Sequence, residues 1–168
     1  MLICSSFSAH SASINASPVV SGTAHEALFD IDIRGQEGFA VGAAGDIYHT
    51  FDDGVTWQRE RSDNSLALLS VSFSDTSVVA VGQYGVILVR NSEGDWRQVE
   101  SGTKERLFAV DINNNGYAIV AGSFGTLLRS VDGGNSWQSV APSWAGIFDD
   151  PDNRLGGLFD PSIYGVKV

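Results

Sequence analysis

Residues 42–57 read GAAGDIYHTFDDGVTW, and this stretch decides the fold because the chain contains it three times. The second copy is GQYGVILVRNSEGDW at residues 82–96, and the third is GSFGTLLRSVDGGNSW at residues 122–137. The opening glycines of the three copies lie 40 residues apart. A period of this length is typical of proteins built from stacked structural repeats.

Each copy is preceded by two short stretches with strand character. The first of them alternates apolar and polar residues at Leu28–Ile33, Leu68–Phe73 and Leu107–Ile112, as expected for a strand. With one strand after the glycines and one from the tryptophan, each unit holds four short antiparallel strands in about 40 residues, the size of a β-propeller blade. We therefore predict an all-β fold: a partial β-propeller of three four-stranded antiparallel blades and the first strand of a fourth.

The first and third copies contain the turn pattern (S/T)-x-D-x-G-x-(S/T)-W. Its residues are Thr50, Asp52, Gly54, Thr56 and Trp57, and Ser130, Asp132, Gly134, Ser136 and Trp137. The carboxylate and the hydroxyls can accept backbone N–H groups inside the turn, and the tryptophan can fill the gap between blades. The middle copy lacks the aspartate, so its turn is expected to be less firmly held. We expect both glycines of each G-x-x-G turn to relieve the cost of positive φ.

The repeats occupy residues 26–168, with a different segment before them. The units span about 28–66, 67–106 and 107–141, and a fourth starts at 163–168 after an insert over 139–162. Three units and one strand are too few to close a ring. We interpret the chain as a fragment of a six- to eight-bladed propeller, the alternative being subunits that join into one ring. Residues 1–25 form an N-terminal arm or a truncated signal sequence.

Composition and motifs narrow the classes of function. The net charge of −10 argues against nucleic acid as a partner, since phosphate binding needs clustered Lys and Arg. The single Cys4 excludes an internal disulfide and a cysteine-based zinc site. His10, His25 and His49 share no metal-ligand spacing, and motifs for a nucleophile elbow or a phosphate loop are missing. No apolar run approaches the roughly 20 residues of a membrane span. We expect no cofactor, no metal and no enzymatic activity.

The tryptophan-containing turn pattern is the Asp-box. Its combination with the hairpin G-x-x-G-x-(I/L), at residues 42–47 and 122–127, resembles the repeats of the photosystem II assembly and stability factor family and of related bacterial exported proteins. The resemblance covers roughly residues 28–140. It implies a non-enzymatic protein-binding or assembly scaffold, whose partner is a protein such as a membrane complex or its subunit.

The same resemblance implies an exported location: periplasm, thylakoid lumen or outside the cell. Asp-boxes also occur in sialidases, so a fragment of a sialidase-type glycoside hydrolase is the alternative function. The arginines of this chain do not follow the arrangement of that family, and we interpret Asp52 and Asp132 as residues that fasten their turns.

Strand parity locates a candidate binding edge. The G-x-x-G turns and the crossovers between blades share one edge of the sheets, and exposed aromatic and basic loop residues are common in protein-binding surfaces. We predict partner binding by Tyr84, Phe124, Arg59, Arg61, Lys104 and Arg106. The alternative is that the aromatic side chains pack against their own loops. For the first-strand aspartates Asp30, Asp32 and Asp111, both the lining of a central channel and simple solvation remain open.

Overall fold

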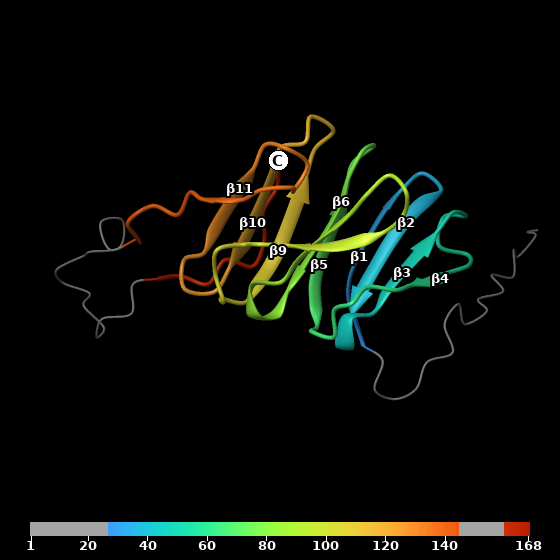
Figure 1. Cartoon of the computed structure of the whole chain (residues 1–168), viewed down its shortest axis with the longest axis horizontal. Helices are drawn as coiled ribbons and strands as arrows, with labels where there is room; N and C mark the ends of the chain where they lie inside the picture. The colour runs from blue at the N-terminus through green and yellow to red at the C-terminus, as the bar shows by residue number, and fades with distance from the viewer. Residues whose placement is uncertain (1–26, 145–159) are drawn as a thin grey trace, which may run out of the picture.

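Three sheets follow one another along the chain in the computed structural model, which describes residues 27–144 and 160–168 (Figure 1). Each sheet has four strands in sequence order, as the sequence predicts. The blades are blade 1, with β1 (Leu28–Arg34), β2 (Glu37–Gly42), β3 (Ile47–Thr50) and β4 (Gln58–Glu60); blade 2, with β5 (Leu68–Phe73), β6 (Val78–Gly82), β7 (Ile87–Arg90) and β8 (Trp96–Val99); and blade 3, with β9 (Leu107–Ile112), β10 (Ala118–Gly122), β11 (Leu127–Ser130) and β12 (Gln138–Ser139). The predicted arm over 1–25 and most of the predicted insert lie outside the described residues.

Two apolar clusters hold the blades together. One joins Phe39 of β2 to Val71 of β5, between blades 1 and 2. The other joins Val81 of β6 to Val120 of β10, between blades 2 and 3. All four side chains are at most 3% exposed, and burying a side chain of this kind stabilises the fold by roughly 1.5–3 kcal/mol. Blade 2 is therefore apolar on both faces, as a sheet between two others must be.

Two of the three repeat tryptophans lie at contacts between the described blades. Trp96 packs against the cluster of blades 1 and 2, and Trp137 packs against the cluster of blades 2 and 3, as the sequence predicts for both. The face of blade 1 that carries Ile31 has no neighbouring blade among the described residues. Ile31 is 54% exposed, whereas the equivalent residues Val71 and Val110 are 3% and 6% exposed. Blade 1 thus presents a surface of the kind that blades 2 and 3 bury.

Side-chain oxygens also link the first strands of neighbouring blades. Strands β1, β5 and β9 are edge strands of their sheets, so alternate N–H groups have no partner strand. The Val71 N–H donates to Asp30 of blade 1 at 2.9 Å. One blade further on, the Val110 N–H donates to Ser70 at 3.3 Å. The Ser70 hydroxyl donates in turn to Asp30 at 2.7 Å, which makes the link continuous across three blades.

A second row of the same bonds lies two residues further along these strands. The Phe73 N–H donates to Asp32 at 3.2 Å, and the Ile112 N–H donates to Ser72 at 3.4 Å. The Ser72 hydroxyl also lies 3.2 Å from Asp111. The sequence left channel lining and solvation open for these aspartates. In the structure their carboxylates accept hydrogen bonds from the segment that follows, Asp30 and Asp32 from blade 2 and Asp111 from Val168.

Residues 160–168 lie against blade 3, where the sequence places a fourth first strand. The Val168 N–H donates to Asp111 at 2.7 Å, continuing the second row of bonds. Tyr164 stacks on Phe108 of β9, with ring centroids 4.7 Å apart. These residues form no strand, since none of the described residues offers them a neighbouring strand to pair with.

The G-x-x-G turns use their two glycines for different reasons. Gly85 has φ +70°, the left-handed region that favours glycine. Gly82 is extended, at φ −172°, and a Cβ there would clash with the carbonyl oxygen of Ala67 in the crossover from blade 1. The expectation of positive φ is therefore wrong for the first glycine, which is needed because backbone runs directly against it.

The third-copy Asp-box is closed by its own side chains. The Ser130 hydroxyl accepts the Gly134 N–H at 2.9 Å. Asp132 accepts the Ser136 N–H at 2.9 Å and the Ser136 hydroxyl at 2.6 Å. The Trp137 indole N–H donates to the Gly134 carbonyl at 2.9 Å. The turn thus fixes the tryptophan that packs between blades.

The blade 1 box has the same bonds. Thr50 accepts the Gly54 N–H at 3.0 Å, and Asp52 accepts the Thr56 N–H at 2.8 Å. The pKa of Asp52 is lowered, mainly by the hydrogen bonds from Thr56. Burial acts to raise the pKa of Asp132, but its hydrogen bonds, chiefly from Ser136, lower it overall.

The middle copy replaces the missing aspartate with an asparagine. Asn91 Oδ1 accepts the N–H groups of Glu93 at 3.0 Å and Asp95 at 2.8 Å. The Trp96 indole donates to Glu60 of blade 1 at 2.6 Å instead of to its own turn. This tryptophan therefore ties two blades together directly.

Replacing Ser130 with alanine is expected to destabilise the protein. Ser130 is 2% exposed, and its loss leaves the buried Gly134 N–H without its acceptor, at a cost of about 1–3 kcal/mol. Urea unfolding followed by circular dichroism measures the change. Ser92→Ala, in the exposed middle turn, is the control, and equal stability of the two variants would contradict the assigned role.

The Asp132 carboxylate is expected to make stability fall in acid. A group whose folded-state pKa is lowered stabilises the fold above its unfolded pKa, about 3.9 for aspartate, and loses this effect as the pH falls through the folded value. The difference in unfolding free energy between the natural protein and Asp132→Asn should therefore be largest above about pH 5 and shrink below about pH 4. A difference that does not vary with pH would exclude this contribution.

Candidate functional site

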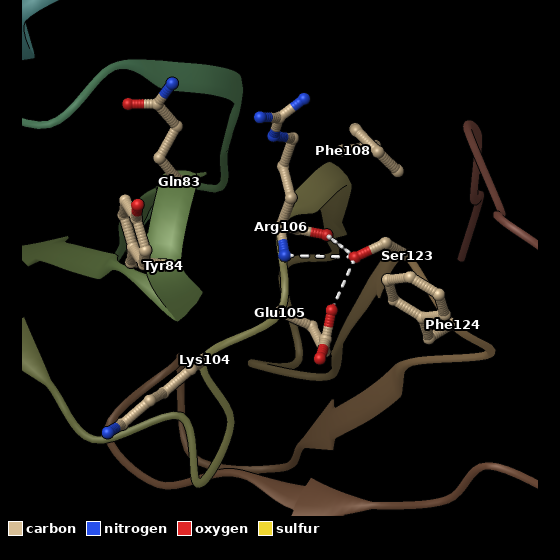
Figure 2. Close-up of a pocket in the computed structure, with 8 residues that line it drawn as sticks. All are labelled: Gln83, Tyr84, Lys104, Glu105, Arg106, Phe108, Ser123 and Phe124. Atoms are coloured by element: carbon tan, nitrogen blue, oxygen red, sulfur yellow. Dashed lines mark hydrogen bonds between the residues drawn. The ribbon is translucent and has the colours of Figure 1, made fainter.

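Four segments from blades 2 and 3 surround a shallow hollow of about 440 Å³ at one edge of the sheets (Figure 2). They are the turn after β6, the crossover to blade 3, the start of β9 and the turn after β10. The lining residues are Gln83, Tyr84, Lys104, Glu105, Arg106, Phe108, Ser123 and Phe124. This is the edge that strand parity assigns to the G-x-x-G turns and the crossovers.

Two aromatic side chains stand at the tips of the turns. Tyr84 and Phe124 flank the crossover in Figure 2 and are 73% and 62% exposed. Their φ angles are +52° and +50°, in the left-handed region that bulky residues rarely adopt. At the same position of blade 1 the residue is Ala44, with φ +54°. The turn therefore tolerates a small residue, and the strained aromatic residues are a feature of blades 2 and 3, of the kind that clusters at functional sites.

The crossover between the two turns is held in place by hydrogen bonds. The Ser123 N–H donates to the Arg106 carbonyl at 2.9 Å, and the Arg106 N–H donates to the Ser123 hydroxyl at 3.1 Å. The Ser123 hydroxyl lies 3.0 Å from Glu105 Oε2 (Figure 2). The end of the crossover that carries Arg106 is therefore fixed against the turn after β10.

Four of the six residues predicted to bind a partner come together here. Lys104 and Arg106 are exposed, and within residues 27–144 and 160–168 neither side chain forms an ion pair. The other two do not line the hollow. Arg59 pairs with Asp46 on blade 1, and Arg61 lies in the crossover between blades 1 and 2.

Sequence reasoning missed the polar members of the site. Gln83 and Ser123 occupy the same position of the repeat, the second residue of G-x-x-G. Both side chains accept a backbone N–H from the preceding crossover, Gln83 from Ala67 at 3.3 Å and Ser123 from Arg106 at 3.1 Å. The signal was the recurrence of a polar residue in these two blades, in contrast to Ala43 in blade 1.

The described part of the chain shows no grouping of His, Cys, Asp and Glu side chains that could hold a metal ion. Within the same residues, no helix is long and apolar enough to cross a bilayer. The side chains that line the hollow offer aromatic surface, two cations, one carboxylate, one amide and one hydroxyl.

Comparison with known proteins gives the family. The family model described as photosynthesis system II assembly factor YCF48 matches residues 11–104, more than half of the chain. A search of curated proteins finds no significant match.

Two solved structures that are similar to this chain are also described as YCF48. A structure described as YCF48 bound to D1 peptide is 24% identical with a TM-score of 0.60, and the match covers 68% of this chain and 40% of that one. YCF48 from Cyanidioschyzon merolae is 27% identical with a TM-score of 0.58, over 68% of this chain and 37% of that one.

A third structure is similar in fold alone. The GH74 xyloglucanase from Xanthomonas campestris is 16% identical with a TM-score of 0.53, over 69% of this chain and 22% of that one. The chain spans about two fifths of the length of the two YCF48 structures. These matches confirm the partial Asp-box propeller and the resemblance stated from the sequence. The chain belongs to the YCF48 family of photosynthesis system II assembly factors.

Proposed function

We propose that this chain is a non-enzymatic scaffold that binds a protein segment at the hollow between blades 2 and 3. The observation that carries the proposal is the pair of exposed aromatic residues, Tyr84 and Phe124, which flank the crossover that carries Lys104 and Arg106. Neither cation forms an ion pair within the part of the chain that the structure describes. A relative of known structure is described as bound to a D1 peptide. The proposed partner is accordingly a subunit of a membrane complex, with a photosystem II subunit as the first candidate.

The chemistry of the hollow suggests what such a segment contains. Tyr84 and Phe124 offer rigid apolar surface, which is where binding energy concentrates in protein interfaces. Lys104 and Arg106 can donate to a carboxylate, and such charge-assisted bonds are stronger than neutral ones. A segment with an apolar side chain beside an acidic group fits both. Since the whole chain carries a charge of −10, attraction of an acidic segment depends on these local cations.

The proposal places the protein in an exported compartment: periplasm, thylakoid lumen or outside the cell. The Ser- and Ala-rich residues 1–25 and membership of the family support it. Fractionation of the source cells, with antibody detection of the natural protein, tests this location. Detection in the cytoplasmic fraction alone would contradict it.

Tyr84→Gly is expected to weaken binding without loss of stability. Glycine relieves the positive φ, a strain of order 1–3 kcal/mol at a bulky residue, and removes the aromatic surface, so binding should fall at least about tenfold. Isothermal titration with peptides of the D1 subunit and urea unfolding measure the two quantities. Ala44→Gly makes the same backbone change on blade 1 and should leave binding unchanged. Undiminished binding by Tyr84→Gly would overturn the site.

Arg106→Ala is expected to weaken the same binding about tenfold and to reduce its dependence on salt, since a hydrogen bond to a charged group contributes about 1.5–3 kcal/mol. Arg61→Ala removes an exposed cation outside the hollow and is the matched control. Equal effects of the two substitutions on binding would show that affinity depends only on net charge, and would contradict a specific role for Arg106.

The proposed absence of catalysis is tested directly. Fluorogenic sialosides and xyloglucan oligosaccharides should show no turnover above background with the full chain. Turnover that Arg106→Ala abolishes would establish a glycoside hydrolase and contradict the scaffold.

A further inference from the structure

A groove of about 470 Å³ borders the hollow along the same crossover. Residues 104–106 line the hollow and residues 101–103 line the groove, so the two follow one another along the chain. Phe124 lines both of them. The other walls of the groove include Leu128, Trp137, Ser139, Trp144 and Asp160. A segment bound in the hollow can therefore pass Phe124 directly into the groove.

Two tryptophan side chains give the groove its apolar character. The Trp137 indole N–H donates to the Gly134 carbonyl at 2.9 Å, and the Trp144 indole N–H donates to the Gly125 carbonyl at 2.8 Å. The indole N–H is the single polar group of a tryptophan side chain, and in both residues the protein itself supplies its acceptor. Both side chains are half-buried. They therefore offer apolar ring surface to a bound segment.

The position of Trp144 sets blade 3 apart from the other two blades. In blades 1 and 2 the backbone of the following crossover lies against the second glycine of the G-x-x-G turn, as Thr103 does at Gly85. At Gly125 of blade 3 the indole of Trp144 lies in this place. Blade 3 thus presents an aromatic ring at an edge where blades 1 and 2 present backbone, next to its exposed Phe124.

The hollow and the groove differ in charge. Lys104, Glu105 and Arg106 line the hollow, which gives it a surplus of positive charge. Among the described residues that line the groove, Asp160 is charged and none is a lysine or arginine. An acidic group is therefore attracted to the hollow and repelled from the groove, and such complementarity fixes the register of a bound partner.

We propose that the bound protein segment continues from the hollow past Phe124 into the groove, where a bulky apolar side chain packs against Trp137 and Trp144. This inference rests on the proposed function and adds the direction of the segment. Its acidic group lies at Arg106, and its apolar anchor lies on the other side of Phe124. The anchor carries no acidic neighbour, because a second carboxylate would face Asp160.

Photo-crosslinking to the full chain tests this path. The probe is the D1 peptide that binds most tightly by titration, with benzoylphenylalanine placed beside its acidic residue or at either end. Mass spectrometry should find the first crosslink within residues 104–108 and the crosslink of one end within residues 137–144. If neither end reaches residues 137–144, the path is wrong. An acidic position that crosslinks outside the hollow, or a lack of binding by every D1 peptide, would instead contradict the proposed function on which the path rests.

Trp144→Ala tests the apolar anchor. Binding of the whole peptide should weaken about tenfold, since aromatic anchors carry much of the energy of an interface. A peptide shortened to the part that fills the hollow should bind the natural protein and Trp144→Ala equally. Phe51→Ala removes a 58% exposed aromatic side chain from the Asp-box turn of blade 1 and is the matched control. Equal loss for both peptides, or loss for neither, would overturn the anchor.

A pair of peptides tests the assigned direction. With glutamate in place of the apolar anchor, binding should be about twofold to fivefold weaker than with glutamine, the size of effect expected for one pair of exposed charges. This difference should shrink in Asp160→Asn and persist in Glu93→Gln, an exposed carboxylate in the turn after β7. An equal difference in Asp160→Asn would show that the anchor does not lie beside Asp160.

Discussion

The first strands of blades 2 and 3 are edge strands with N–H groups that no strand of their own sheet accepts, and the preceding blade supplies the acceptors. Asp30 and Ser70 perform this role in one row of bonds, and Asp32 and Ser72 perform it in the next. A buried N–H without a partner costs about 1–3 kcal/mol. Stacking of the blades therefore does two things: it gives the edge-strand N–H groups their acceptors, and it buries the apolar faces of the sheets.

The candidate site depends on this stacking. Its walls come from blades 2 and 3, and the crossover between them carries both cations. Because Gly85 and Gly122 have no Cβ, the backbone of this crossover can run directly against both turns, at Thr103 and Arg106. Tyr84 and Phe124 can then stand on either side of it. A change that separates the two blades would be expected to disperse the site even if every side chain in it were kept.

Much of the fold could be predicted from the sequence, because its signals are local. Alternating residues gave the strands, and the recurrent tryptophans gave the contacts between blades. What failed depended on segments distant in the chain. Position 82 requires glycine because the backbone of Ala67 lies directly against it. The carboxylate of Asp30 is placed to accept the N–H of Val71 in the next blade. Neither relation can be seen without the register between blades.

The site was predicted only in part, because it too depends on which distant segments lie together. Strand parity correctly brought the G-x-x-G turns and the crossovers to one edge, and so placed Tyr84, Phe124, Lys104 and Arg106 around the same hollow. It also included Arg59, which lies on strand β4 and pairs with Asp46. Parity assigns an edge to a loop, but it cannot tell which blade-to-blade contact a loop residue joins.

Native-state hydrogen exchange tests most directly whether the blades complete one another. The Val71 and Val110 amides lie on edge strands and have only side-chain acceptors in the neighbouring first strands. If these bonds hold the blades together, both amides should exchange as slowly as the amides of the central strands β6 and β10, through global unfolding alone. Exchange of Val71 and Val110 at the rate of exposed turn amides, with the central strands still protected, would show that each blade stands by itself and would contradict the account.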